Sequence, residues 1–94
     1  MLFAFYCLDR DGHADVRAQN REAHVAYLTS RRDAMVTAGP LLDDDGESMI
    51  GSLILLDLPD RAAAEAFAAG DPYAKAGLFA ETTITGVRQV YPKS

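Results

Sequence analysis

The side chains best suited to chemistry lie on the first helix that the sequence predicts. Arg17, Arg21 and His24 follow one another at steps of four and three, and Leu28 comes four residues later. Such steps place all four in one stripe along a helix, which we expect beside its apolar face. A histidine at that boundary is expected to be partly buried, and an imidazole in such a place suits a general acid or base. Taken alone, a single helical histidine is more often a packing or surface residue.

Asp71 is the second candidate, and it has two compatible roles. It precedes Pro72, so its carboxylate is expected to cap a short helix that has the proline at its first position. The functional alternative is a carboxylate that orients His24 and stabilises its imidazolium form. A carboxylate has two oxygens, so one role does not exclude the other.

Ser52 and Tyr73 are weaker candidates with ordinary alternatives. Ser52 follows Gly51 in an expected strand, where a hydroxyl is usually a plain sheet residue. It would hydrogen-bond a ligand if it points to the face of the sheet without helices. No nucleophile elbow surrounds it, so a serine hydrolase is not predicted. Tyr73 and Phe79 would wall a pocket near Asp71, although core packing is the commoner role of such side chains.

Metal and cofactor motifs are weak in this sequence. The run from Asp9 to Asp15 has the look of a calcium loop, but it lacks the glycine and the bidentate glutamate at the required positions. The simplest interpretation of the acidic run from Asp43 to Glu47 is a solvated hairpin turn. His13 has no second histidine at ligand spacing, and no glycine-rich phosphate loop is present. We therefore expect neither a metal nor a cofactor.

Hydrophobic periodicity and turn residues predict the elements that must position these side chains. A long helix is expected from about Ala14 until Gly39-Pro40 ends it. The other expected elements are strands at 2–8, 39–42, 49–58 and 78–91, a helix that begins at 60 and ends at 70, and a helical turn at 72–77. The resulting β-α-β-β-α-β order predicts an α+β, ferredoxin-like antiparallel sheet with two helices on one face.

Composition narrows the function classes. A chain of 94 residues has the length of a single domain, which we expect to span residues 1–94. It contains 9 Lys and Arg residues and 14 Asp and Glu residues, which gives a formal net charge of −5. This balance argues against nucleic acid and anionic membranes as partners, whereas a small ligand is compatible with it. Cys7 is the only cysteine and is expected to be a buried thiol, so no intrachain disulfide is predicted. The apolar N-terminus lacks a basic leader and is shorter than a membrane span, which makes cytoplasm the default location.

Several separated motifs resemble the YCII-related (YciI-like) family. The motifs that carry the resemblance are Arg21-x-x-His24-x-x-Tyr27-Leu28, Ala38-Gly39-Pro40-Leu41-Leu42, Gly51-Ser52, Asp71-Pro72-Tyr73, Ala76-Gly77-Leu78-Phe79 and Arg88-Gln89-Val90-Tyr91. They span nearly the whole chain. One departure is Glu22, where family members often carry proline. The resemblance implies a homodimer built as a dimeric α/β barrel, with a cleft that holds a histidine and an aspartate, here His24 and Asp71, with Ser52 nearby.

These observations give one leading function and two alternatives. The leading expectation is a cofactor-independent enzyme of lyase or isomerase type that acts on a small organic acid, with His24 moving the proton and Asp71 orienting it. Arg21 would hold a substrate carboxylate, and Ser52 and the backbone amides near Gly39 would hydrogen-bond the substrate. The first alternative is a non-catalytic dimer in which the same pocket binds a ligand. A purely structural module, the second alternative, predicts no pocket near His24.

Overall fold

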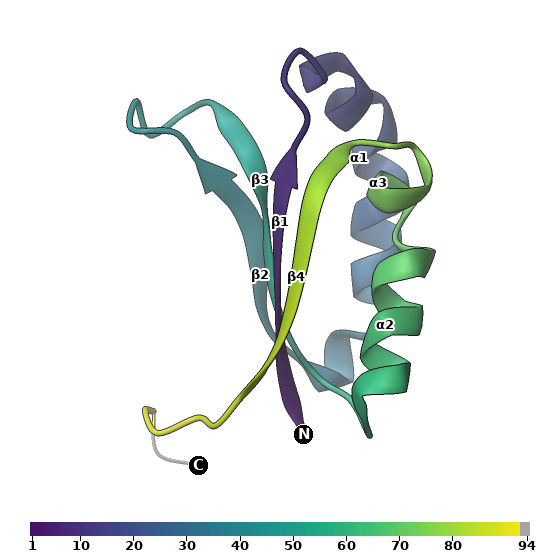
Figure 1. Ribbon diagram of the computed structural model, residues 1–94, viewed down its shortest axis with the longest axis vertical. Coiled ribbons are helices and arrows are strands. Elements are labelled where there is room, and N and C mark those ends of the chain that lie inside the picture. Colours follow the sequence, from purple (N-terminus) through teal and green to yellow (C-terminus); the bar gives the residue numbers. More distant parts are fainter. Residues whose placement is uncertain (93–94) are drawn as a thin grey trace.

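The computed structural model describes residues 1–92 and shows a four-stranded antiparallel sheet with helices on one face (Figure 1). The elements are β1 (Leu2–Asp9), α1 (Ala14–Thr29), the 3₁₀ turn η1 (Arg32–Ala34), β2 (Met35–Leu42), β3 (Met49–Asp57), α2 (Arg61–Gly70), α3 (Pro72–Lys75) and β4 (Phe79–Val87). The strands lie in the order β2-β3-β1-β4. This is the ferredoxin-like arrangement, and the predicted fold class is confirmed.

Alternation along β1 decides which face of the sheet is buried. Phe5 pairs with Ile54 of β3 on one side and with Ile84 of β4 on the other. Phe3 and Phe5 point towards the helices and are buried, while Tyr6, the next residue along the strand, is 46% exposed on the opposite face. The core therefore lies between the sheet and the helices. Its buried members are Phe3, Phe5, Cys7, Ile54, Leu56, Leu58, Ala64 and Phe67.

The other face of the sheet carries no helix (Figure 1). Tyr6 of β1 lies on it, opposite Leu53 of β3, and Leu55 follows at the next position of the same face. Both leucines are half-buried, and Val36 at the edge is 51% exposed. We call Tyr6, Val36, Leu53 and Leu55 the open sheet face. An apolar surface of this kind is normally covered by another layer of structure.

The first helix is shorter than the sequence predicted. It ends at Thr29, where the expectation was a helix to Gly39-Pro40, and β2 already begins at Met35. The hydroxyls of Thr29 and Ser30 donate to the carbonyl oxygens of Val25 and Tyr27, an alternative that weakens helices. Residues from Met35 to Leu42 pair with β3 through backbone hydrogen bonds, and a helix over these residues would lose that pairing. Long-range pairing therefore overrides the local helical period.

The second half of the chain follows the prediction more closely. Asp60 caps α2, with its side chain accepting from the Ala63 backbone N–H, and Gly70 is the last residue of that helix. The helical turn α3 is shorter than expected and β4 ends at Val87, four residues before the predicted Tyr91. Cys7 is buried as expected, and burial raises the pKa of its thiol to about 11. No helix in the described part of the chain is long and apolar enough to cross a membrane.

Candidate functional site

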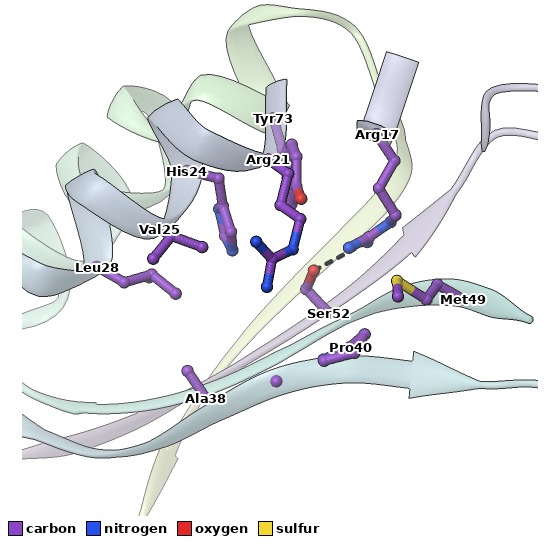
Figure 2. Close-up of a pocket in the computed structure, with 11 residues that line it drawn as sticks. Arg17, Arg21, His24, Val25, Leu28, Ala38, Pro40, Met49, Ser52 and Tyr73 are labelled. Atoms are coloured by element: carbon purple, nitrogen blue, oxygen red, sulfur yellow. Dashed lines mark hydrogen bonds between the residues drawn. The ribbon is translucent and has the colours of Figure 1, made fainter. Parts of the chain in front are cut away.

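The most deeply buried side chains of α1 are polar, although Tyr27 and Leu28 of the same helix pack against the core. Arg17 and His24 are the buried residues of this helix, whereas Val25 beside them is 42% exposed. The sequence placed their stripe beside an apolar face, and the structure makes it the inward face. A cavity lies between this part of α1 and the sheet, and both side chains line it (Figure 2).

His24 and Asp71 meet across the gap between α1 and α3. The His24 Nδ1 atom lies 2.8 Å from Asp71 Oδ1, and both side chains are buried. An ionised carboxylate only accepts hydrogen bonds, so Nδ1 carries the proton and Nε2 of neutral His24 is left as an acceptor. The same Oδ1 accepts from the Tyr73 backbone N–H at 2.9 Å, so Asp71 also caps α3. Asp71 thus contacts His24 and caps α3 at the same time.

Tyr73 forms the wall behind the histidine. Its ring is stacked on the His24 ring, with centroids 3.9 Å apart and planes inclined by 16°. The Arg17 guanidinium carbon lies 4.7 Å from the centroid of the same ring, and Phe79 meets it edge-on at 6.0 Å. Burial raises the pKa of Tyr73 against the opposing influence of Arg17 and Arg21, so its phenol is neutral at neutral pH.

Ser52 and Arg17 meet at the other end of the cavity. Arg17 Nη2 donates to Ser52 Oγ at 2.9 Å, while Arg17 Nε and Nη2 donate to the two carboxylate oxygens of Asp9 at 2.7 and 3.0 Å. Burial disfavours the charge of Arg17, but the hydrogen bonds and the charge of Asp9 outweigh it, and the pKa of Arg17 is raised. Ser52 points to the helix-covered face, alongside its β1 partner Cys7, and not to the helix-free face considered from the sequence.

Arg17 and Asp9 were not placed in the site by the sequence analysis. Arg17 was part of the stripe with Arg21 and His24, but no role was assigned to it. Asp9 stood out only as a member of an acidic loop. A buried arginine needs a carboxylate partner, so the inward position of Arg17 was the missing signal.

The cavity has a volume of about 310 Å³, at the lower end of the range for small-molecule sites. It is lined by Arg17, Arg21, His24, Val25, Leu28, Ala38, Gly39, Pro40, Met49, Ser52 and Tyr73. Figure 2 shows Arg21 and His24 reaching from the helix towards the strands, with Ser52 pointing up from β3. All the residues expected at the site thus come together: five line the cavity, and Asp71 stands behind His24.

The basic side chains at this cavity differ in their partners. Arg17 is matched by Asp9, and His24 is matched by Asp71. Arg21 is exposed, and it forms no ion pair with any residue in the range 1–92. Arg21 is therefore the arginine at the cavity that has no carboxylate partner among these residues. Residues 1–92 include no group of three or more His, Cys, Asp or Glu side chains placed to hold a metal ion.

Comparison with known proteins places this geometry in a family. The model of the YCII-related domain matches residues 1–88. The chain belongs to the YCII-related family. Protein YciI of Escherichia coli O6:H1 and that of Shigella flexneri are each 29% identical to it over 98 residues, an alignment that covers 97% of this chain and 100% of theirs. An uncharacterized protein of Haemophilus influenzae matches to the same extent.

Solved structures of similar proteins include an enzyme with a small ligand. The 5-chloro-2-hydroxyhydroquinone dehydrochlorinase of Burkholderia phenoliruptrix, in complex with 2,5-dihydroxybenzoquinone, has a TM-score of 0.86 and 34% identity over 94% of both chains. An antibiotic biosynthesis monooxygenase has a TM-score of 0.55 and 15% identity, covering 96% of this chain and 99% of that one. The second likeness shows the fold alone.

Proposed function

We propose that this YCII-related protein is a cofactor-independent enzyme that transfers a proton on a small organic acid or a similarly acidic ring compound. The observation that carries the proposal is the 2.8 Å contact between His24 Nδ1 and Asp71 Oδ1 at the wall of a ligand-sized cavity. A base whose orientation is fixed by a buried carboxylate is the usual form of a general base. The similarity to a dehydrochlorinase agrees with a reaction of lyase type.

The proposed chemistry is an elimination or isomerisation that begins at His24. Nε2 accepts a proton from the substrate, and the electron pair left behind expels a leaving group such as chloride or shifts to a neighbouring carbon. Asp71 holds the ring in place and stabilises the imidazolium that forms. In an elimination the proton then passes from His24 to water, and in an isomerisation His24 returns it to the neighbouring carbon. Neither step requires an oxidant or a reductant.

Arg21 supplies the charge that selects the substrate in this proposal. A substrate anion that reaches the cavity meets the Arg21 guanidinium, which has no internal carboxylate partner, whereas the Arg17 guanidinium is already paired with Asp9. An ion pair at a partly enclosed site is stronger than one in bulk water. Tyr73 borders the cavity beside His24, and the Gly39 backbone borders it on the strand side.

We also propose that two copies of the chain pack through the open sheet face and form the dimeric barrel of this fold class. Tyr6 and Val36 are 46% and 51% exposed there, and the half-buried Leu53 and Leu55 continue the apolar surface. A two-layer domain hides such a face most simply against a symmetrical copy of itself. The cytoplasmic location expected from the sequence stays a prediction.

The test of the proposed reaction combines a substrate screen with one variant. Chloride release and product formation are followed with 5-chloro-2-hydroxyhydroquinone and with a set of small chlorinated and unsaturated acids. The wild-type protein is expected to convert at least one of them, and His24→Ala is expected to lose turnover while keeping its fold and oligomeric state. Binding without conversion across the whole set would instead support a ligand-binding protein, and full activity of His24→Ala would refute the role of the histidine.

A further inference from the structure

The Arg17 side chain is placed by three hydrogen bonds that leave it little freedom. Nε and one hydrogen of Nη2 are taken by Asp9, at 2.7 and 3.0 Å, and the second hydrogen of Nη2 points at Ser52 Oγ, 2.9 Å away. The bidentate pair fixes the plane of the guanidinium, and the stacking on Tyr73 fixes its height. The arginine is only 7% exposed. Its direction is therefore dictated by the protein and not by solvent.

This placement determines the polarity of the Ser52 hydroxyl. A guanidinium has donors and no acceptor, so in the contact with Arg17 the serine oxygen must accept. Its own proton has to point elsewhere, and no acceptor for it occurs among residues 1–92. Ser52 lines the cavity, and Figure 2 shows its oxygen directed into the space between Arg17 and Arg21. The hydroxyl proton is thus free to be donated to a bound molecule.

We propose that Arg17, held by Asp9, is a positioning residue that turns Ser52 into a hydrogen-bond donor, so that the cavity selects ligands with an oxygen acceptor at that end. The matching chemical class is a ketone, enolate or phenolate whose oxygen lies against β3. The adjacent guanidinium polarises the serine O–H bond, which strengthens its donation to an oxygen that carries negative charge. This inference concerns the same cavity as the proposed function.

The competing explanation is that Arg17 only ties the first helix to the sheet. In that case its loss would weaken ligand binding by the same factor whether or not Ser52 has a hydroxyl. If Arg17 acts through that hydroxyl, its replacement has no further effect once Ser52 is alanine. A double-mutant cycle separates the two cases, because a purely structural contribution adds to the effect of Ser52→Ala and an effect through the hydroxyl does not.

The variants are Arg17→Lys, Ser52→Ala and the double variant, with Arg31→Lys as the control. Lysine keeps the charge next to Asp9 but is a point donor that cannot hold two carboxylate oxygens and Ser52 in one plane. Arg31 is a matched control, since its guanidinium carbon also lies over an aromatic ring, 5.6 Å from the centroid of Phe67, and it does not line the cavity. Thermal unfolding of each variant verifies that it is folded.

The measurement is the dissociation constant of 2,5-dihydroxybenzoquinone, followed by calorimetry. Loss of one donor to such an oxygen weakens binding about tenfold, so Ser52→Ala and Arg17→Lys are each expected to bind about tenfold more weakly. The double variant is expected to bind no more weakly than the weaker of the two single variants, and Arg31→Lys to bind like wild type. If Arg17→Lys does not fold, Asp9→Asn, which loosens the same arginine, takes its place in the cycle.

Several outcomes would overturn the inference: additive losses of about a hundredfold in the double variant, unchanged binding in Ser52→Ala, or no binding of this probe to the wild-type protein. The assay detects binding and not turnover. A protein that shows the expected cycle but converts no substrate would refute the proposed enzyme and still support the role of Arg17. A protein that converts its substrate but shows additive losses of binding in the double variant would support the proposed enzyme and refute the role of Arg17.

Discussion

Replacement of Asp71 by asparagine separates its charge from its hydrogen bonds. Asp71 Oδ1 accepts from His24 Nδ1 at 2.8 Å and from the Tyr73 backbone N–H at 2.9 Å, and an asparagine oxygen can accept from both. Asparagine is also as good an N-cap as aspartate, so we expect Asp71→Asn to lower the free energy of unfolding by less than about 1 kcal/mol. What it removes is the negative charge that stabilises the imidazolium.

That charge sets the expected loss in rate. A hydrogen bond to a charged group contributes about 1.5–3 kcal/mol and a neutral one about 0.5–1.5 kcal/mol, a difference of about 1–1.5 kcal/mol. At about 1.36 kcal/mol for each factor of ten, kcat of Asp71→Asn should fall about tenfold or more. The assay is steady-state turnover of the substrate found in the screen, alongside urea unfolding of the same preparations.

Asp71→Ala is the comparison that tests the reasoning. It removes both hydrogen bonds from a buried position, so the cap and the histidine partner are lost together, and we expect a cost of about 2–4 kcal/mol. An Asp71→Asn variant with unchanged kcat would refute the electrostatic role of Asp71. An Asp71→Asn variant as unstable as Asp71→Ala would refute the account of its capping.

Three further predictions concern the contact between Gly70 and Tyr27, the burial of Cys7, and the open sheet face. A Cβ at Gly70 would lie 2.5 Å from the Tyr27 hydroxyl, which donates to the Phe67 carbonyl. Gly70→Ala should therefore lower the free energy of unfolding, measured in urea, by about 1–2 kcal/mol, and by much less in a Tyr27→Phe background. Equal losses in both backgrounds would contradict this contact. Because the pKa of Cys7 is raised from 9.0 to about 11, its thiolate population at pH 8 is about a hundredfold lower than in the unfolded chain. A disulfide reagent should therefore react at least that much more slowly with the folded protein, and comparable rates would be incompatible with a buried thiol. Tyr6→Asp places a charge on the open sheet face and should convert the proposed dimer to monomer in light scattering; an unchanged mass would exclude that face as the interface.

The order of elements could be predicted because each carries a local signal. Gly46 in the hairpin and Gly77 before β4 have φ values of 72° and 74°, which only glycine adopts readily, and Asp60 caps its helix through its own side chain. The end of α1 could not be predicted in this way. Met35 fits the helical period as well as a strand, and only the long-range pairing with Leu56 of β3 decides between them.

The candidate site was accessible from the sequence only in part. Candidate side chains and their family pattern identified His24 and Asp71, which are separated by 47 positions in the chain. The direction of Ser52 depends on the register of β3 against β1, where it pairs with the buried Cys7, and register is a property of the folded sheet. The inward turn of Arg17 depends in the same way on how α1 sits on the sheet, which a period of 3.6 residues does not specify.

The central claim is that the cavity between α1 and the sheet binds a substrate whose proton His24 removes. The most direct measurement is a crystal structure of this protein soaked with 2,5-dihydroxybenzoquinone. We predict the ring in the cavity between α1 and the sheet, with one ligand oxygen about 3 Å from His24 Nε2 and the His24–Asp71 contact intact. A ligand bound only elsewhere on the molecule, or a His24 ring turned away from a ligand in the cavity, would contradict the account.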